Sequence, residues 1–345
     1  MFKHLISKLT QGKELTDNEI SELINAIKHD EISEVQLAGF LVAFLMKGAT
    51  IQEVVAITKA MRACCTPLKP QIKAELMDTC GTGGGLSTFN ISTATAIVAA
   101  AAGIPVAKHG SRSISSLSGS ADVLEALGVE IKLSPRTIEK MIEEIGIAFI
   151  YAPLFHPVMS KVLPIEKMLG IKTIFYTMIG PLINPAFASM HLLGVYKPEM
   201  LDIVTQTAKQ LSFTNAMFVH GIDGLDEISL LGETRINELK NGEINTYEIA
   251  PEDFGLRRCT LEDLKSDEPS INAKIIKGVF EGKISGAKRD AIVFNSAGAL
   301  KTGEKADNLA QGIKLANELI DSGAVALKLK QLCEMSHSFK QGNYE

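Results

Sequence analysis

The chain has 345 residues, of which 46% are hydrophobic and 22% charged, and its formal net charge at neutral pH is −5. This length supplies enough apolar material for one large domain or two domains, and the composition excludes a disordered or fibrous protein. The acidic balance argues against nucleic acid as a partner, because nucleic-acid-binding proteins are more often basic.

Residues 1–65 are predicted to be helical throughout. In LTDNEISELINAIKHD, Thr16 is a candidate N-cap, Glu19 completes a capping box, and isoleucines and leucines share one helical face. A second helix is predicted from a capping Ser33 to Gly48, and TIQEVVAITKAMRACC predicts a third. Because this part carries no strand signal, we expect a small helical subdomain.

From about residue 75, short apolar segments alternate with helical patterns. The expected strands are IPVAKHG, VEIKLS, IAFIYAP, ASMHLLGVY and NAMFVHG, and helices are expected through SADVLEALG, RTIEKMIEEIG and EMLDIVTQTAKQLS. Such alternation implies βαβ units and a mainly parallel sheet. The Asn241-Gly242 pair predicts a β-hairpin, and the chain from RDAIVFNSAGALK onward predicts helices.

The predicted fold class is therefore α/β, with a small all-helical subdomain packed on a larger α/β domain that has a mainly parallel central sheet. We place the subdomain at residues 1–70, with a helical contribution from about 165–190, and the α/β domain at 71–345. A cleft between the two parts is the natural place for a ligand.

Cysteine usage and hydrophobicity predict a cytoplasmic protein. The five cysteines are odd in number and lack the spacing of a zinc site or a disulfide framework. The N-terminal segment soon acquires acidic residues, unlike a signal peptide. The least polar run, ATAIVAAAAGIPVA, is too short to span a bilayer, so we expect no membrane partner.

A glycine-rich turn in DTCGTGGGLSTFNISTATA points to an anion site. The glycines that let the backbone approach a ligand are Gly81, Gly83, Gly84 and Gly85. The polar residues predicted to cap the following helix are Asn90, Ser92 and Thr93. A helix N-terminus with free N–H groups binds phosphate, although the spacing is neither that of dinucleotide-binding turns nor that of P-loops. A purely structural turn is the alternative.

A second polar loop lies in AKHGSRSISSLSGSADVLEALG, after the next predicted strand. Lys108, His109 and Arg112 fall within five residues, and several serines follow. Loops after neighbouring parallel strands open at the same sheet edge, so both loops are expected to face one ligand. A solvated polar loop is the alternative.

Asp226 and Glu227 are adjacent carboxylates on a loop after a later predicted strand, in VHGIDGLDEISL. Mg²⁺ takes one or two carboxylates together with phosphate oxygens and water, so this pair would complete a site with the two anion loops. Alone, such a pair is more often part of a surface loop. His109, His156 and His220, judged singly, are more often structural than catalytic.

The motifs resemble those of the anthranilate phosphoribosyltransferase family over nearly the whole chain. GTGG, TFNIST, KHGSRSISSLSGSADVLEALG, FHPVM, GPLINPA, LLGVY, VHGIDGLDEISL and PEDFGL stand in the family's order and close to its spacing. The resemblance implies a homodimer through the helical subdomain and a step of tryptophan biosynthesis. In that step, a Mg²⁺-dependent enzyme transfers a phosphoribosyl group from 5-phosphoribosyl 1-pyrophosphate to anthranilate and releases pyrophosphate. Pyrimidine nucleoside phosphorylases share the fold, but the Asp-Glu pair argues against them.

The resemblance also implies roles for individual residues. Those that would bind the donor are Gly81, Gly84, Gly85, Thr88, Asn90, Ile91, Ser92, Thr93, Lys108, Ser115, Ser116 and Ser120. Lys108 is the implied catalytic residue, because its ammonium would neutralise charge on the departing pyrophosphate. The implied metal ligands are Ser92, Asp226 and Glu227. The acceptor would meet Gly81, His109, Ser111, His156 and Glu166.

Departures from the family pattern cluster on the same segments. The loop GTGGGLSTFNIST is one residue shorter and lacks an Asp, Ser111 replaces an Asn, and FYTMIGP is one residue longer and lacks an Asn. Glu166 stands where the family has the Arg that pairs with the carboxylate of anthranilate. Two like charges about 4 Å apart cost roughly 4 kcal/mol at an effective dielectric near 20.

These departures leave three readings open. In the first, anthranilate is the acceptor and Lys161 or Lys167 takes over from the missing arginine. In the second, the enzyme uses another aromatic or heterocyclic amine. In the third, the chain is a binding paralogue without catalytic activity.

Overall fold

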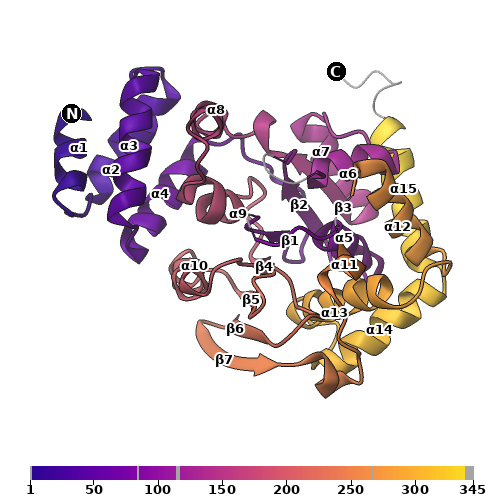
Figure 1. The fold of residues 1–345 in the computed structure, drawn as a ribbon. Coiled ribbons are helices and arrows are strands. Elements are labelled where there is room, and N and C mark those ends of the chain that lie inside the picture. Colours follow the sequence, from indigo (N-terminus) through magenta and orange to yellow (C-terminus); the bar gives the residue numbers. More distant parts are fainter. Residues whose placement is uncertain (1, 84, 114–116, 266, 339–345) are drawn as a thin grey trace.

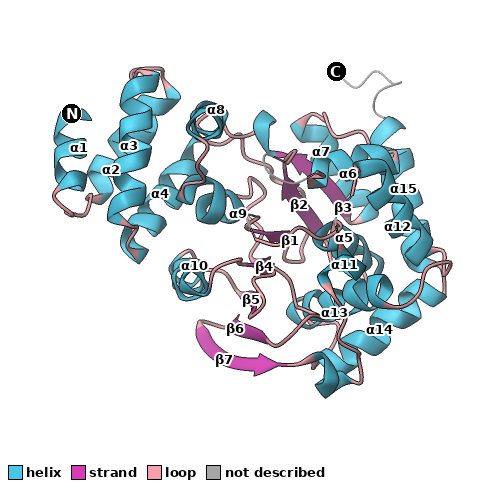
Figure 2. Cartoon of the chain, in the orientation of Figure 1, coloured by secondary structure: helices cyan, strands magenta, loops and turns pink. Residues whose placement is uncertain are grey.

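The computed structural model describes residues 2–83, 85–113, 117–265 and 267–338, and within them a helical part packs against an α/β part (Figure 1, Figure 2). The chain begins with four helices, α1 (Phe2–Thr10), α2 (Asp17–Lys28), α3 (Glu34–Lys47) and α4 (Ile51–Cys64). The capping box predicted at Thr16 and the capping role predicted for Ser33 are confirmed, and Ser33 and Thr50 each form a capping box as well. The helices of the N-terminal segment are thus set by local capping signals.

The described residues of the α/β part form a seven-stranded sheet in the order β3-β2-β1-β4-β5-β6-β7. Its parallel strands are β1 (Met77–Gly81), β2 (Val106–Gly110), β3 (Ile147–Tyr151), β4 (Met190–Gly194) and β5 (Asn215–Gly221). The antiparallel hairpin is β6 (Thr234–Lys240) and β7 (Glu243–Ile249). Asn241 and Gly242 make its turn with φ of 52° and 81°, which confirms the predicted hairpin.

The remaining helices cover the sheet and link its strands (Figure 1). Those of the α/β part are α5 (Ile91–Ala101), α6 (Ser120–Leu127), α7 (Pro135–Ile145), α10 (Pro198–Gln210), α11 (Leu261–Leu264), α12 (Pro269–Phe280), α13 (Ala287–Thr302), α14 (Leu309–Asp321) and α15 (Ala324–Ser338). Between β3 and β4 the chain forms a short 3₁₀ turn (Ala152–Leu154), α8 (Met159–Leu169), a π-helix (Phe175–Ile179) and α9 (Gly180–Leu182). A second 3₁₀ turn (Pro251–Phe254) follows β7.

The order of the strands determines where a ligand can bind. From β1 the chain builds outward through β2 to β3, and then returns to the other side of β1 with β4 and β5. The carboxyl ends of β1 and β4 therefore flank a topological switch point, where open α/β sheets hold their ligands. The glycine-rich turn follows β1, and the loop with Asp226 follows β5.

Two hydrophobic clusters hold the fold together. One joins the sheet to α5, α6 and the C-terminal helices, with Ile97, Phe149 and Phe294 at most 1% exposed. The other joins α1–α4 to α8, to α10 and to the near face of β4 and β5, around Phe40 and Phe218. The helical part is thus anchored on the sheet through the second cluster.

One predicted strand is wrong. VEIKLS forms no strand, although Val129, Ile131 and Leu133 are buried and alternate with more exposed residues as in a strand. The backbone N–H of Glu130 donates to the Ser336 hydroxyl of α15 rather than to a neighbouring strand. The alternation thus reflects packing of one side of an extended segment.

In the described part of the chain, no helix is long and apolar enough to cross a bilayer.

Candidate active site

A cavity of about 430 Å³ lies at the carboxyl ends of β1 and β2, bordered on its other side by α8 and the π-helix. Most of the residues predicted for donor, metal and acceptor line it. They are Gly81, Gly85, Thr88, Asn90, Ile91, Ser92, Thr93, Lys108, His109, Ser111, Ser120, His156, Asp226 and Glu227. Gly84, Ser115 and Ser116 lie outside the described residues. Glu166 is not among the residues that line the cavity.

The glycine turn packs directly against the loop that carries the two acids. The backbone N–H of Gly83 donates to Asp226 Oδ2 at 2.7 Å. A Cβ atom at Gly81 would overlap the Asp226 carboxylate, and one at Gly194 would overlap the Asp226 carbonyl group. The glycines of this region are therefore needed for contact between two protein segments as well as for access of a ligand.

Lys108 and Glu227 both line the cavity. Lys108 is 2% exposed, and its ammonium donates to the carbonyl of Thr79 at 2.6 Å. Burial lowers the pKa of this ammonium, whereas the negative charges of Asp78 and Glu227 raise it. Glu227 accepts a backbone hydrogen bond from Ser92 in the first turn of α5. A cation and a helix N-terminus thus converge beside the carboxylates.

The donor set of Asp226, Glu227 and Ser92 fits a magnesium ion. Burial raises the pKa of both carboxyls, and the neighbouring Asp226 raises that of Glu227 further. Two adjacent carboxylates with raised pKa values repel one another, and a hard dication with oxygen ligands would relieve this repulsion. The residues present therefore match the chemistry of the predicted ion.

His109 and His156 form a neutral pair on the opposite wall. Their Nε2 atoms are 3.0 Å apart and the rings meet edge to face. Burial lowers the pKa of His156 to about 4 and takes the pKa of His109 well below its usual value. One ring therefore donates and the other accepts, and neither carries a positive charge near neutral pH.

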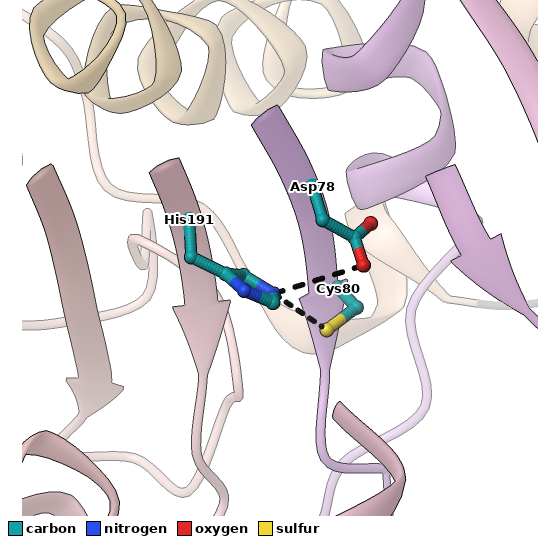
Figure 3. A group of neighbouring side chains, drawn as sticks. All are labelled: Asp78, Cys80 and His191. Atoms are coloured by element: carbon teal, nitrogen blue, oxygen red, sulfur yellow. Dashed lines mark hydrogen bonds and ion pairs between the residues drawn. The ribbon is translucent and has the colours of Figure 1, made fainter. Parts of the chain in front are cut away.

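A buried polar network joins β1 to its neighbours β2 and β4, and Figure 3 shows the part of it formed by Asp78 and Cys80 of β1 and His191 of β4. Asp78 accepts hydrogen bonds from the backbone N–H groups of Thr79 and His109 and from the Asn184 side chain. His191 Nε2 lies 3.3 Å from Cys80 Sγ and 4.0 Å from Asp78 Oδ2. Because the carboxylate already accepts three hydrogen bonds, we interpret the cluster as structural support for His109.

The expected cap of α5 is wrong in one detail. Asn90 occupies the N-cap position, but its side chain makes no cap hydrogen bond. Its amide instead exchanges hydrogen bonds with Ser118 and accepts from Asn272. Asn90 therefore ties the two anion loops together and leaves the first turn of α5 without a side-chain cap.

The acceptor side differs most from the expectation. Glu166 is 2% exposed, and its Oε1 accepts from the backbone N–H and the hydroxyl of Thr173. Lys161 pairs with Asp30 at 2.5 Å, and Lys167 is exposed outside the cavity lining. The cavity is lined instead by two residues that sequence reasoning missed, Lys172 and Tyr176.

Comparisons with known proteins agree with this geometry. A glycosyl transferase family model of a helical bundle domain matches residues 3–65, and one of an a/b domain matches residues 73–326. An anthranilate phosphoribosyltransferase of Acetivibrio thermocellus is 46% identical over 340 residues, covering 98% of both chains. The chain belongs to the anthranilate phosphoribosyltransferase family. The enzyme of Methanobrevibacter smithii is 45% identical over 98% of this chain and the whole of its own.

Solved structures of the family share the fold. Anthranilate phosphoribosyltransferase from Thermus thermophilus superposes with a TM-score of 0.89 at 37% identity, over 96% of this chain and 99% of that one. The Saccharomyces cerevisiae enzyme, in complex with PRPP and Mg, has a TM-score of 0.88 at 28% identity, with 98% of each chain covered. The two-part fold expected from the sequence is thereby confirmed.

The segment FYTMIGP, which on the sequence resemblance is one residue longer than the family pattern, contains a π-helix. In FYTMIGP, the N–H of Gly180 bonds to the carbonyl of Phe175, five residues earlier. A π-turn holds one residue more than an α-turn, so a single added residue can be taken up within one turn of a helix. Tyr176 lies in this turn, and its hydroxyl would be 3.2 Å from a Cβ atom at Gly83. The π-helix thus packs against the glycine turn at Gly83.

The buried histidines predict loss of stability in mild acid. Burial lowers the pKa of His156 and of His191 to about 4, whereas the unfolded chain takes up these protons near pH 6.5. The unfolded state thus binds more protons between these values, and stability falls as the pH drops from 6.5 toward 4. We expect each histidine to contribute roughly 2–3 kcal/mol of this loss.

Urea unfolding at pH 7 and pH 4.5 would test this prediction. His191→Gln should flatten the pH dependence by the share of one histidine, and the exposed His29→Gln is the matched control. Equal pH dependence in the wild type and in His191→Gln would contradict it.

Proposed function

We propose that the protein transfers the phosphoribosyl group of 5-phosphoribosyl 1-pyrophosphate to anthranilate, with Mg²⁺ as cofactor and release of pyrophosphate. The observation that carries the proposal is the convergence of the glycine turn, Lys108 and the Asp226–Glu227 pair on one cavity. The near-complete coverage of anthranilate phosphoribosyltransferases at 46% and 45% identity supports it.

The donor is proposed to lie with its pyrophosphate over the glycine turn and the N-terminus of α5. Ser92 and Thr93, in the first turn of that helix, would present hydroxyl and N–H groups to the phosphates. Lys108 would stabilise the negative charge that grows as the bond to the anomeric carbon breaks. Mg²⁺, when bound by Asp226 and Glu227, would add positive charge to the same leaving group.

The acceptor amine is proposed to reach the anomeric carbon from the side of the histidine pair. Its nitrogen is weakly basic and loses its proton readily once the new bond forms, so a strong general base is unnecessary. His109 and His156 are neutral and hold one another in place, so they can position the amine without adding charge beside it. Catalysis would then rest on charge stabilisation and positioning.

A fluorescence assay tests the function directly. The protein is mixed with the phosphoribosyl donor, Mg²⁺ and anthranilate, and loss of anthranilate fluorescence is followed. Turnover of anthranilate supports the proposal. If the protein turned over another aromatic amine but not anthranilate, it would be a phosphoribosyltransferase with a different acceptor. Donor binding without turnover of any amine would indicate a binding paralogue. The position of Glu166 favours anthranilate, because its carboxyl bonds to Thr173 and is not among the residues that line the cavity.

We also propose that the chain is a homodimer that associates through α3. This helix buries one apolar stripe and exposes another, with Val35 and Met46 83% and 81% exposed and Val42 41%. Met168 on the neighbouring α8 is 69% exposed as well. Exposed apolar stripes of this kind are typical of contacts between protein chains.

Val42→Asp tests the dimer. A charge at the centre of an apolar interface should shift the particle from the mass of two chains to that of one in light scattering. Glu34→Gln, at the exposed start of the same helix, is the control. A wild-type protein with the mass of one chain would contradict the proposal.

Two further expectations stay proposals. We place the protein in the cytoplasm, and the five cysteines, all among the described residues and all free, support this. The boundary between the subdomains near residue 70 remains a prediction.

A further inference from the structure

We propose that Lys172 is the residue that binds the carboxylate of the acceptor, in place of the arginine that the family carries at the position of Glu166. The inference rests on the proposed function, because it concerns the acceptor of that same reaction. It names a specificity-determining residue outside the predicted site residues.

The first step is that Glu166 has a structural role. Its Oε1 accepts two hydrogen bonds from Thr173, and the Thr173 hydroxyl and carbonyl in turn bond to Phe175 and Thr177. The carboxyl therefore fixes the segment between α8 and the π-helix. Burial raises the pKa of this carboxyl.

The second step is the position of Lys172. It directly precedes Thr173, so the contact with Glu166 holds its backbone in place. Lys172 lines the cavity, and its charge interacts with both Glu166 and Asp226. Lys172 therefore supplies a cation to the cavity lining, on the segment that Glu166 holds in place. An acceptor bound in this cavity could present its carboxylate to that cation.

The third step is the aromatic surface beside the ammonium. Lys172 Nζ lies 5.3 Å from the centre of the Tyr176 ring, and Tyr176 lines the cavity too. Met159, Leu163 and Ile183 add apolar surface to the same cavity. An aromatic ring can pack on this surface while its carboxylate meets the ammonium, so the extra residue of the π-helix and the lysine act together.

Arg112 and Lys108 also line the cavity, and each is held in place by groups of the protein. Arg112 bonds to Asp122 and Glu125, at 2.7 and 2.6 Å. Lys108 donates to the Thr79 carbonyl beneath the phosphate turn. Lysine binds a carboxylate as a point charge where arginine uses a planar fork, so a shifted position is compatible with the same ligand.

The test compares a charged acceptor with its neutral amide. KM is measured for anthranilate, for 2-aminobenzamide and for the phosphoribosyl donor in the wild type, in Lys172→Gln and in Lys172→Arg. We expect Lys172→Gln to raise KM for anthranilate by about tenfold or more, because a hydrogen bond to a charged group is lost. KM for 2-aminobenzamide and the donor should change by less than about twofold, and Lys172→Arg should recover most of the loss. Lys59→Gln, an exposed lysine on α4, is the matched control.

The outcomes separate this inference from the function itself. If the wild type does not turn over anthranilate, the proposed function fails. Binding of anthranilate is then measured by fluorescence in the same variants, with Mg²⁺ and pyrophosphate present. Weaker binding only of the charged ligand in Lys172→Gln would still support the lysine's role. Four results would overturn the role of Lys172. Two concern Lys172→Gln: an equal loss for anthranilate and its amide, or an effect confined to the donor. The others are a loss that occurs only in Lys167→Gln and no binding of anthranilate to the wild type.

Discussion

Gly194→Ala is expected to disrupt the loop that carries the metal ligands. Gly194 ends β4 opposite Gly81, and its carbonyl accepts the N–H of Thr82. An added Cβ atom would overlap the carbonyl group of Asp226 and lie 2.9 Å from its Cα atom. The obstacle is backbone, so a rotamer change cannot relieve it, and we expect a loss of stability above about 3 kcal/mol together with loss of activity.

Gly39→Ala is the matched control for this prediction. Gly39 lies inside α3, where a Cβ atom would sit 3.6 Å from Ile6 Cδ1, an ordinary contact. Alanine is favoured over glycine in a helix by about 1 kcal/mol, so the control should be slightly more stable than the wild type. Urea unfolding and the anthranilate assay compare the two variants, and a Gly194→Ala protein with wild-type stability would show that the loop can move away at no cost.

Much of the fold was predictable because its signals are local. Thr16 and Ser33 each find their partner three residues later, and Asn241-Gly242 needs only its own backbone preference. The failures depend on partners far along the chain. VEIKLS has the alternation of a strand, but whether it joins the sheet depends on α15, some two hundred residues later. Asn90 likewise bonds to Ser118 and Asn272 rather than to its own helix.

The candidate site shows the same difference between features that the sequence predicts and features that depend on distant partners. Its donor side follows from strand order, since loops after parallel strands must share one edge, and the glycine turn, Lys108 and Asp226 line one cavity. Its acceptor side depends on where single side chains point. Glu166 turns toward Thr173 because the chain folds back after α8, and this contact has no signature in composition or spacing. The one sequence signal that could have found Tyr176 is the extra residue in FYTMIGP, which indicates a changed turn beside the glycine loop.

Glu227→Gln is expected to lower activity strongly while it stabilises the ligand-free protein. The Glu227 carboxyl is buried beside Asp226, and both effects raise its pKa well above the usual value. A raised pKa in the folded state means that the folded protein holds a proton that the unfolded chain releases. Stability is therefore lost as the pH rises above the ordinary carboxyl pKa of about 4.3. A neutral glutamine removes this loss at neutral pH but also removes a proposed metal ligand.

Melting temperatures with and without Mg²⁺, at pH 5.5 and pH 8, measure both effects. The wild type should gain stability from Mg²⁺, and Glu227→Gln should melt higher without the ion, gain less from it and show a weaker pH dependence. Its kcat/KM should fall by about a hundredfold or more, because charge on the leaving group is less well neutralised. Glu243→Gln, exposed on β7, carries the same charge change away from the cavity and should behave as the wild type. If Glu227→Gln kept the full Mg²⁺ response, the Glu227 carboxylate would not be a ligand. Asp226→Asn would then show whether Asp226 binds the ion without Glu227.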